Sequence, residues 1–301
     1  MKAAVFREVN QPMEIEEISV SKPGPREVLI RTKAAGICHS DLHFWNGSYP
    51  GQVPMVLGHE SAGVVEQVGS DVHYVKPGDH VITCLSVFCG HCEQCLTGHM
   101  SLCKEPETNR SQDEPPRLSH NDKPLTQFAQ LGSFAEMMLV HEHALVKVRE
   151  DMPMDRAALI GCGVTTGIGA VIHTAKVEPG STVAVIGCGG IGLSAINGAA
   201  LAGAARIIAV DMVPSKLELA RKFGATDVVN ASDGEAVGSV IEMTGGGVHY
   251  SFEAIGLKAT AEQAFQMLRA GGTATVIGMI PPGQMVSLHG VDFLSEKKIQ
   301  G

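Results

Sequence analysis

The sequence predicts two domains, a β-rich domain followed by an α/β domain with a doubly wound parallel sheet. Up to about residue 90, short apolar stretches alternate with Gly/Pro turns. From Ser181 onwards, strand-like and helix-like stretches alternate instead. The 301 residues, of which 44% are hydrophobic and 18% charged, are enough to bury two cores.

The first domain is expected to be a partly open β-barrel or sandwich, because its short strands are separated by turn residues. Strands are expected at residues 2–9, 14–20, 27–35, 61–68, 80–84, 133–140 and 144–148. A polar, Pro-rich segment from 104 to 131 interrupts them and is too long for a simple connection.

The second domain is expected to begin with a strand at 182–186 and a helix at 193–202, joined by a glycine-rich turn. Further strands are expected at 206–210, 227–229, 250–253 and 273–278, and further helices at 215–223, 235–244 and 260–268. This alternation is typical of a doubly wound nucleotide-binding domain.

The stretch 181–205 contains no charged residue and is long enough to cross a bilayer. Its first part is β-branched, its second part is Ala-rich, and glycines lie between. That pattern indicates a buried strand, a turn and a buried helix. We therefore expect no membrane span here.

The charge and the N-terminus exclude two further classes of protein. A formal net charge of −9 argues against a nucleic-acid partner. The N-terminal residues have no apolar signal region, so we expect a cytoplasmic protein. Without an export signal, the eight cysteines indicate metal ligands or free thiols before disulfides.

A cluster of four cysteines is the most specific motif in the chain. Cys89, Cys92, Cys95 and Cys103 are separated by two, two and seven residues. Four thiolates on one short loop, with no open position, predict a structural zinc site. An iron–sulfur site is disfavoured because the spacing is not that of a ferredoxin and no Pro follows the fourth Cys. Unligated core thiols are the remaining alternative.

A second metal site is indicated within residues 36–60, which contain Cys38 and His59. A thiolate and an imidazole suit a catalytic zinc with an open position, but a third ligand must come from elsewhere. Cys162, between two glycines, is either that ligand or a small core residue. The alternative for the first two residues is a buried Cys and a surface His.

The glycine-rich turn Gly187-Cys-Gly189-Gly-Ile-Gly192 predicts a dinucleotide site, because it follows a strand and opens a helix. Asp211 ends the next expected strand, nineteen residues after Gly192. Its carboxylate would hydrogen-bond the adenosine ribose and repel a 2′-phosphate. NAD is therefore favoured over NADP.

Taken together, the chain resembles the zinc-dependent medium-chain alcohol dehydrogenases. The motifs that carry the resemblance are GICHSD (36–41), GHE (58–60), the four-cysteine lobe (89–103), GCGVTTG (161–167), GCGGIG (187–192) and Asp211. The resemblance implies a GroES-like catalytic domain over 1–163, with the structural zinc lobe at 89–103, and a Rossmann NAD-binding domain over 164–301. It also implies an active site in the cleft between them.

The resemblance assigns roles to individual residues. Cys38, His59 and Cys162 match the catalytic zinc ligands, Glu60 an acid behind the metal, and Asp41 the residue that orients the zinc-bound histidine. Further matches are Ser40 and His43 (proton relay), His39 (pyrophosphate), Thr166 and Ile191 (nicotinamide), Lys216 (ribose), and Leu85, Trp45 and Tyr49 (substrate pocket).

The resemblance implies reversible oxidation of alcohols, primary ones first, to aldehydes or ketones with two zinc ions and NAD. The long 104–131 segment also fits an alternative, an S-hydroxymethyl-thiol (glutathione-dependent formaldehyde) dehydrogenase. A non-catalytic NAD-binding relative or inactive fragment is a third possibility, disfavoured because all seven zinc ligands are present. A small-molecule substrate and a homodimer or homotetramer are expected.

The chain stops at Gly301, where family members continue and return to the catalytic domain. We expect either a fragment or a shortened product. Expressed alone, it is expected to be poorly soluble or inactive, because strand edges and apolar surface would be left uncovered.

Overall fold

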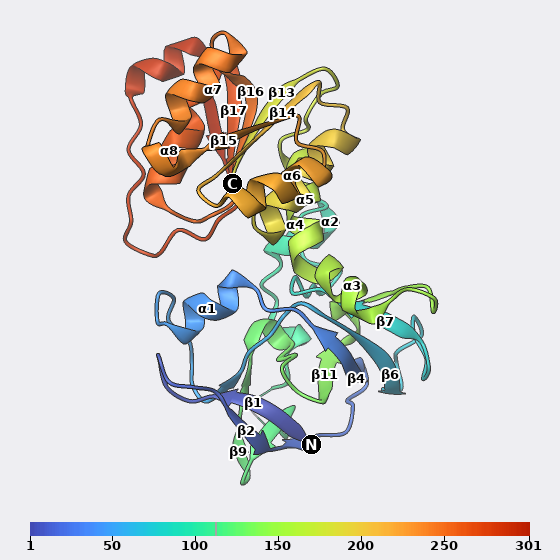
Figure 1. The fold of residues 1–301 in the computed structure, drawn as a ribbon. Helices are drawn as coiled ribbons and strands as arrows, with labels where there is room; N and C mark the ends of the chain where they lie inside the picture. The colour runs from blue at the N-terminus through green and yellow to red at the C-terminus, as the bar shows by residue number, and fades with distance from the viewer. Residues whose placement is uncertain (112) are drawn as a thin grey trace. The chain divides into compact units, whose positions relative to one another are not determined.

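The chain folds into two units, Met1–Cys162 and Gly163–Gly301. They are seen in a computed structural model, which describes residues 1–111 and 113–301. The first unit is built on largely antiparallel sheets and the second on a parallel one. This change of sheet type agrees with the change of sequence period at residue 181 (Figure 1).

The main sheet of the first unit has five strands among the described residues, in the order β11-β4-β6-β7-β12. They are β4 (Glu27–Ala35), β6 (Ser61–Val68), β7 (His80–Thr83), β11 (Met137–His141) and β12 (Leu145–Lys147). All pairings in it are antiparallel. Val28 and Ile30 of β4 pack with Val65, Val81 and Met138 in a buried core. This curled, half-barrel sheet is the β-rich fold that the sequence predicts.

Two smaller sheets complete the described part of the first unit. One has the order β10-β5-β1-β2 and the other β3-β8-β9. Their strands are β1 (Lys2–Phe6), β2 (Glu14–Glu17), β3 (Ser19–Val20), β5 (Met55–Val56), β8 (Leu118–His120), β9 (Lys123–Pro124) and β10 (Thr126–Gln127). The 104–131 segment therefore contains three short strands, which its polar, Pro-rich composition does not indicate.

The strand expected at 14–20 is divided into β2 and β3, which belong to different sheets, and two other expected strands of the first unit differ from the structure by three or more residues at one end. The strand expected at 2–9 ends at Phe6, because a turn follows in which Asn10 has φ 61°. The strand expected at 133–140 begins only at Met137. Its earlier amides on Ser133 and Phe134 donate to the carbonyl oxygens of Gly58 and Leu57 instead of to a neighbouring main-sheet strand. The strands at 27–35 and 61–68 are confirmed with both ends.

Short helices lie between these strands. They are α1 (His39–Trp45), α2 (Glu93–Leu96), α3 (Met154–Leu159), and the 3₁₀ turns η1 (Met100–Leu102), η2 (Pro106–Thr108), η3 (Phe128–Gln130) and η4 (Glu142–Ala144). Helix α1 matters most for function, because it carries five of the predicted site residues. Its sequence has no periodic apolar pattern that would predict a helix.

A longer helical segment, Met154–Thr174, runs through α3, the π-helical turn η5 (Ile160–Val164), α4 (Thr165–Gly169) and the π-helical turn η6 (Ala170–Thr174). Its 21 residues are apolar enough to match a membrane span by length and composition, alone among the helices of the described chain. Those two properties are weak evidence, since the core helix of a soluble protein shares them. The stretch 181–205 forms a strand and a helix, as predicted.

The second unit is a six-stranded parallel sheet, counted over its described residues, with the order β15-β14-β13-β16-β17-β18. Its strands are β13 (Thr182–Ile186), β14 (Arg206–Asp211), β15 (Asp227–Asn230), β16 (Val248–Glu253), β17 (Leu268–Val276) and β18 (Lys298–Gln300). Strands β13, β14 and β15 follow one another towards one edge of the sheet, and strands β16, β17 and β18 follow one another towards the other edge. The order therefore reverses between β13 and β16, as in a doubly wound fold.

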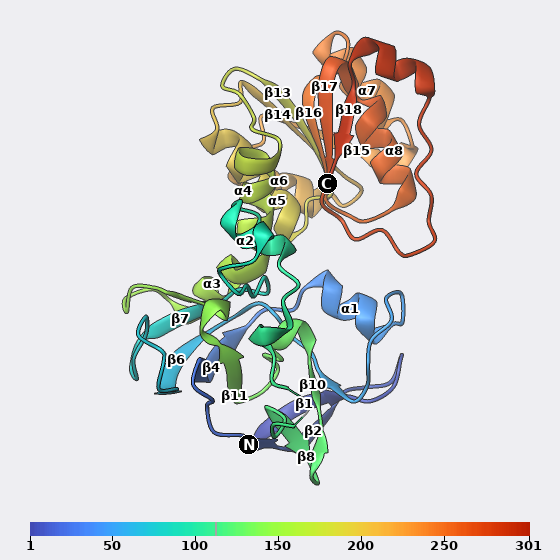
Figure 2. The same ribbon diagram turned by 180° about the vertical axis from the view of Figure 1, so that it is seen from behind.

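Helices cover both faces of this sheet (Figures 1 and 2). Val183 and Val185 of β13 pack with α5 (Gly190–Leu201) and α6 (Pro214–Lys222). Their neighbours Ala184 and Ile186 pack on the opposite face with α7 (Ala236–Thr244) and α8 (Lys258–Gln266). The 3₁₀ turns η7 (Ala231–Asp233) and η8 (Gly290–Ser295) complete the unit. Burial on both faces explains why these strands are almost continuously apolar.

Candidate functional site

Cys38 lies where helix α1 begins. It is the N-cap residue, and its backbone N–H donates to Oδ2 of Asp41, three residues further on, at 3.0 Å. An acid in the first turn also interacts favourably with the helix dipole. This reciprocal capping fixes both the backbone of Cys38 and the position of its sulfur at the start of the helix.

Asp41 joins Cys38 to His59. Its side chain is buried, and its Oδ1 accepts the backbone N–H of Gly58 at 3.0 Å and lies 3.3 Å from Nδ1 of His59. Burial favours the neutral ring, but hydrogen bonds to Asp41 and Cys38 outweigh it and raise the pKa of His59 to about 9. With Nδ1 on Asp41, Nε2 is the ring nitrogen left for a metal.

Cys162 reaches the same place from the π-helical turn η5. A Cβ on the preceding Gly161 would lie 2.5 Å from the carbonyl oxygen of Thr83, so only glycine lets the helix approach strand β7 this closely. The sulfurs of Cys38 and Cys162 are 4.0 Å apart, and with His59 the three ligand atoms lie within 4.8 Å of one another. The structure thus favours the ligand interpretation of Cys162 over simple core packing.

These three residues fit a zinc ion. Two sulfurs at about 2.3 Å from a tetrahedral zinc are about 3.8 Å apart, close to the 4.0 Å observed between Cys38 and Cys162. The hydrogen bond with Cys162, supported by those with His59 and Ser40, lowers the pKa of the Cys38 thiol to about 3. A thiolate at neutral pH is the form that binds metal.

Two further predicted residues, Ser40 and Glu60, are neighbours in the sequence of these ligands. The oxygen of Ser40 lies 3.7 Å from it, on the first turn of α1. Glu60 follows His59 and is buried, and a Cβ on Gly36 would come 2.6 Å from its Oε1. The glycine at position 36 therefore makes room for this carboxylate.

His43, one turn further along α1, is buried, and its Nδ1 has no hydrogen-bond partner among the described residues. Burial, with a smaller effect of nearby His39, lowers its pKa. Its ring lies 4.8 Å from the ring of exposed His39 and 5.5 Å from that of Tyr49. The structure therefore brings both predicted histidines and Tyr49 together on one side of α1.

Two predicted pocket residues have other surroundings. Trp45 packs near Phe6 and Met55, and its Nε1–H donates to the carbonyl oxygen of Gln11 at 2.7 Å. Leu85 is partly exposed just after β7. By contrast, the ring of Phe128 lies edge-on against His59 at 5.1 Å, although the sequence analysis does not single it out. An aromatic residue within a polar excursion is the signal that could have found it.

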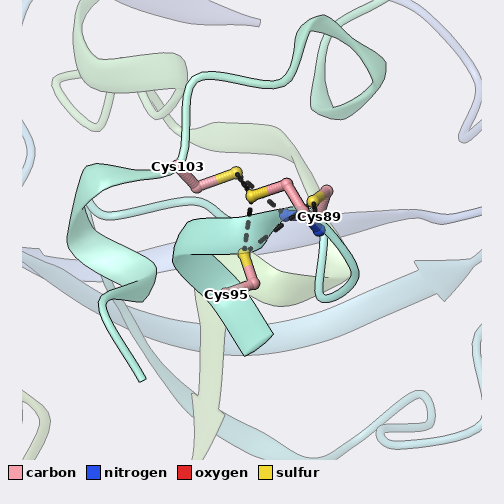
Figure 3. Close-up of side chains that lie close together, drawn as sticks. Cys89, Cys95 and Cys103 are labelled. Carbon is pink, nitrogen blue, oxygen red and sulfur yellow. Dashed lines mark hydrogen bonds between the residues drawn. The ribbon is translucent and has the colours of Figure 1, made fainter. Parts of the chain in front are cut away.

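The four cysteines of the lobe also come together. Cys92 caps α2, Cys95 lies within it, and Cys103 follows η1. The sulfur–sulfur distances are 3.8 Å (Cys89–Cys95), 3.5 Å (Cys92–Cys95) and 3.9 Å (Cys92–Cys103). Figure 3 shows Cys89, Cys95 and Cys103 converging from the helix and its flanking loops. These distances match the edge of about 3.8 Å expected for a tetrahedral zinc–thiolate site.

Backbone amides stabilise negative charge in this lobe. The N–H groups of His91 and Cys92 donate to the Cys89 sulfur at 3.4 and 3.3 Å, and that of Cys89 donates to the Cys103 sulfur at 3.3 Å. Although burial opposes it, the two donors to Cys89 lower its pKa to about 6. All eight cysteines are free thiols, in agreement with the sequence analysis.

The glycine-rich turn has the geometry of a nucleotide-binding turn. Gly187 has φ 94°, and a Cβ on Gly192 would lie 1.7 Å from its carbonyl oxygen. A Cβ on Gly189 would meet nothing within 4 Å, and Gly189 caps α5. The first and last of these glycines are thus required by the fold, while the middle one keeps the helix N-terminus open to a ligand.

Asp211, at the end of β14, faces the same turn. Its Oδ2 accepts the N–H of Cys188 at 2.8 Å, and its Oδ1 accepts that of Val213 at 2.9 Å. Burial and the Asp211 charge raise the pKa of the Cys188 thiol to about 12. The carboxylate is therefore held beside the turn in a fixed orientation.

The remaining predicted cofactor residues lie on three helices of the second unit. Thr166 is on α4, Ile191 on α5 and exposed Lys216 on α6. A Cβ on Gly167 would lie 2.4 Å from the carbonyl oxygen of Ile191, so α4 and α5 are in close contact beside Thr166. The structure thus brings Thr166 and Ile191 into one neighbourhood.

Comparison with known proteins agrees with both halves of this arrangement. Residues 24–150 match the family "Alcohol dehydrogenase GroES-like domain", and residues 190–301 match "Zinc-binding dehydrogenase". The chain is 40% identical over 295 residues to alcohol dehydrogenase class-3 of Oryza sativa subsp. japonica, covering 95% of this chain and 77% of that protein.

Two further comparisons extend the similarity. S-(hydroxymethyl)glutathione dehydrogenase of Escherichia coli is 42% identical over 297 residues, which cover 95% of this chain and 80% of that protein. The crystal structure of benzyl alcohol dehydrogenase from Acinetobacter calcoaceticus has a TM-score of 0.92 and 35% identity, covering 99% of this chain and 82% of that one. The chain therefore belongs to the zinc-dependent medium-chain alcohol dehydrogenase family, a family of NAD-dependent oxidoreductases.

Proposed function

We propose that the chain oxidises primary alcohols reversibly to aldehydes with NAD, and that it carries two zinc ions with different roles. The observation that carries this proposal is that the ligand atoms of Cys38, His59 and Cys162 lie within 4.8 Å of one another. The family matches, which cover parts of both units, support it. The four-cysteine lobe would hold a closed structural zinc. The three-ligand cluster would leave one coordination position for substrate.

The chain's own residues supply ligands, orientation and proton transfer. When bound at Cys38, His59 and Cys162, zinc acts as a Lewis acid that makes the alcohol proton more acidic. When bound at the glycine-rich turn, NAD accepts the hydride. Ser40, 3.7 Å from the Cys38 sulfur, would accept the alcohol proton and pass it towards His43. Because burial lowers its pKa, His43 stays neutral, and therefore able to take a proton, to a lower pH.

The other predicted residues would position ligands. Asp41 would orient His59, and Glu60 would place a negative charge behind the metal. Gly187, Gly189, Gly192 and Asp211 would bind the pyrophosphate and ribose, with contacts from His39, Thr166, Ile191 and Lys216. We further propose domains over 1–163 and 164–301, a cytoplasmic homodimer or homotetramer, and no partner other than small molecules.

A second candidate substrate is an S-hydroxymethyl-thiol adduct. Support for it comes from the similarity to an S-(hydroxymethyl)glutathione dehydrogenase and from the length of the 104–131 segment. NADH formation measured on ethanol, benzyl alcohol and other primary alcohols, with and without glutathione plus formaldehyde, tests both candidates. A rate on simple alcohols at least as high as on the adduct is expected. A rate confined to the adduct would favour the second candidate, and no NADH formation with any substrate would refute both.

A further inference from the structure

Glu253 is a fully buried carboxyl group at the carboxyl end of the parallel sheet. It is the last residue of β16, opposite Ile186 of β13 on one side and Val276 of β17 on the other. Within the described residues, no ion pair involves it. Glutamate is seldom this deeply buried without a partner, so its position requires an explanation.

One of its oxygens organises the loop that follows. Oε1 accepts hydrogen bonds from the N–H groups of Ile255 and Gly256, at 2.9 and 2.8 Å, and from the hydroxyl of Thr260 at 2.7 Å. Three donors on one buried oxygen hold residues 254–256 in a single conformation, because each donor would lose a bond if the loop moved.

That loop lies directly against the glycine-rich turn. A Cβ on Gly187 would lie 2.5 Å from Cγ1 of Ile255 and 3.1 Å from the carbonyl oxygen of Ala254. The N–H of Ala254 also donates to the carbonyl oxygen of Ile186 at 2.9 Å. A shift of residues 254–256 would therefore move the turn or open a gap beside it.

The other side of Glu253 faces the loop after β17. Its backbone oxygen accepts the N–H groups of Ile277 and Gly278, at 2.8 and 3.1 Å. Its Oε2 is buried without a hydrogen-bond partner in the described chain, and a Cβ on Gly278 would come within 2.6 Å of it. Glu253 thus contacts both the loop that follows β16 and the loop that follows β17.

These loops flank the place where the strand order reverses between β13 and β16. In doubly wound folds, dinucleotides bind in the crevice at the carboxyl ends of the strands at such a point. We propose that Glu253 is a positioning residue for NAD, holding residues 254–256 against the glycine-rich turn so that their backbone forms one wall of the cofactor crevice. This inference rests on the proposed NAD-dependent function, and Glu253 acts through the loop without touching the cofactor.

The test uses the 301-residue chain and three variants. Glu253→Leu removes the acceptor oxygen, Glu253→Gln keeps one, and Thr260→Val removes one of its three donors. The control is Glu262→Gln, which changes a partly exposed carboxylate on α8, the helix that also carries Thr260. NADH affinity is measured by fluorescence titration, amide exchange of residues 254–257 by mass spectrometry on cofactor-free protein, and the thermal midpoint of each variant by circular dichroism.

We expect NADH affinity to fall about tenfold in Glu253→Leu and about threefold in Glu253→Gln and Thr260→Val, with faster exchange of the 255 and 256 amides. The KM for alcohol should not change. NADH affinity equal to wild type in the folded variants, whatever their thermal midpoints, would overturn the inference. If Glu253→Leu does not fold, Glu253→Gln and Thr260→Val decide. A wild-type chain without NADH binding would instead refute the NAD-dependent function, and exchange would still show whether Glu253 holds the loop.

Discussion

The carboxylate of Asp41 lies 3.3 Å from Nδ1 of His59 and, through its other oxygen, accepts the N–H of Cys38 at 3.0 Å. One buried side chain therefore orients two of the three proposed zinc ligands. It also caps the helix on which Cys38 lies, so the geometry of the cluster and the start of α1 depend on the same carboxylate.

Asp41→Asn tests this dependence. The amide must turn an NH₂ group towards Cys38 N–H or towards the Gly58 and His59 donors, and one of these bonds is lost. We expect the zinc affinity of the three-ligand site to fall by about 10- to 100-fold, measured by competition with a chromophoric chelator. Asp71→Asn, on the exposed surface next to Ser70, is the control. Equal affinities for Asp41→Asn and wild type would contradict the orienting role.

Removing single ligands should distinguish the two zinc sites. Cys38→Ser is expected to lose one of two zinc ions and all alcohol oxidation while the fold survives, because the site is open and catalytic. Cys95→Ser should lose the other zinc and lower the thermal midpoint, because four thiolates tie down that loop. Elemental analysis and thermal melts measure both effects, with Cys84→Ser, outside both clusters, as control. Finding fewer than two zinc ions in wild type purified without chelator would refute the two-site proposal.

Asp211→Gly is expected to reduce the preference for NAD. It removes the repulsion of a 2′-phosphate, a ribose acceptor and the bonds from Cys188 and Val213. The kcat/KM for NAD should fall about tenfold or more, with a smaller loss or a gain for NADP. Glu218→Gln, an exposed carboxylate on α6, is the control. Equal kcat/KM for both cofactors in the wild type would contradict this prediction.

Asp227 should make stability depend on acid pH. Hydrogen bonds from Arg206 and then Thr226 lower its pKa to about 2. Because the unfolded group titrates near pH 3.9, the stabilisation is complete above that pH and is lost as pH falls towards 2. The pair is partly exposed, so we expect about 1 kcal/mol.

Asp227→Asn is therefore expected to lower the thermal midpoint at pH 7 by a few degrees. The difference from wild type should shrink by about half at pH 3, which lies midway between the folded and unfolded pKa values of Asp227. Thermal melts at both pH values measure this, with Glu242→Gln on α7 as the control. A difference that is the same at both pH values would show that the ion pair is not its cause.

Local patterns predict much of this chain. The buried strands of the second unit, the glycine-rich turn and the cysteine lobe are recognisable because neighbouring residues in the sequence act together in space. The same holds for β4 and β6, whose ends are confirmed. The four lobe cysteines lie within fifteen residues, so their spacing alone indicates a common ligand.

Other parts depend on contacts that span the sequence. Cys162 meets Cys38 only because Gly161 lets a helix touch β7, and that contact joins residues 78 positions apart. Phe128 reaches His59 from the polar excursion, and Glu253 works through two loops at once. Helix α1 is set by capping through Asp41 and has no long apolar period. No window of local sequence contains the contacts of Cys162 and Phe128, or the link from Glu253 to the loop after β17.

Asp211 already accepts hydrogen bonds from Cys188 and Val213, and this lowers the entropy cost of binding a nucleotide. A free aspartate on the surface would lose rotamer freedom when a ribose arrives, and this loss would weaken binding. Here the rotamer is selected when the chain folds, so an incoming nucleotide meets an acceptor that is already aligned. The side chain is preorganised, so it can distinguish the ribose of NAD from the 2′-phosphorylated ribose of NADP without first changing its rotamer.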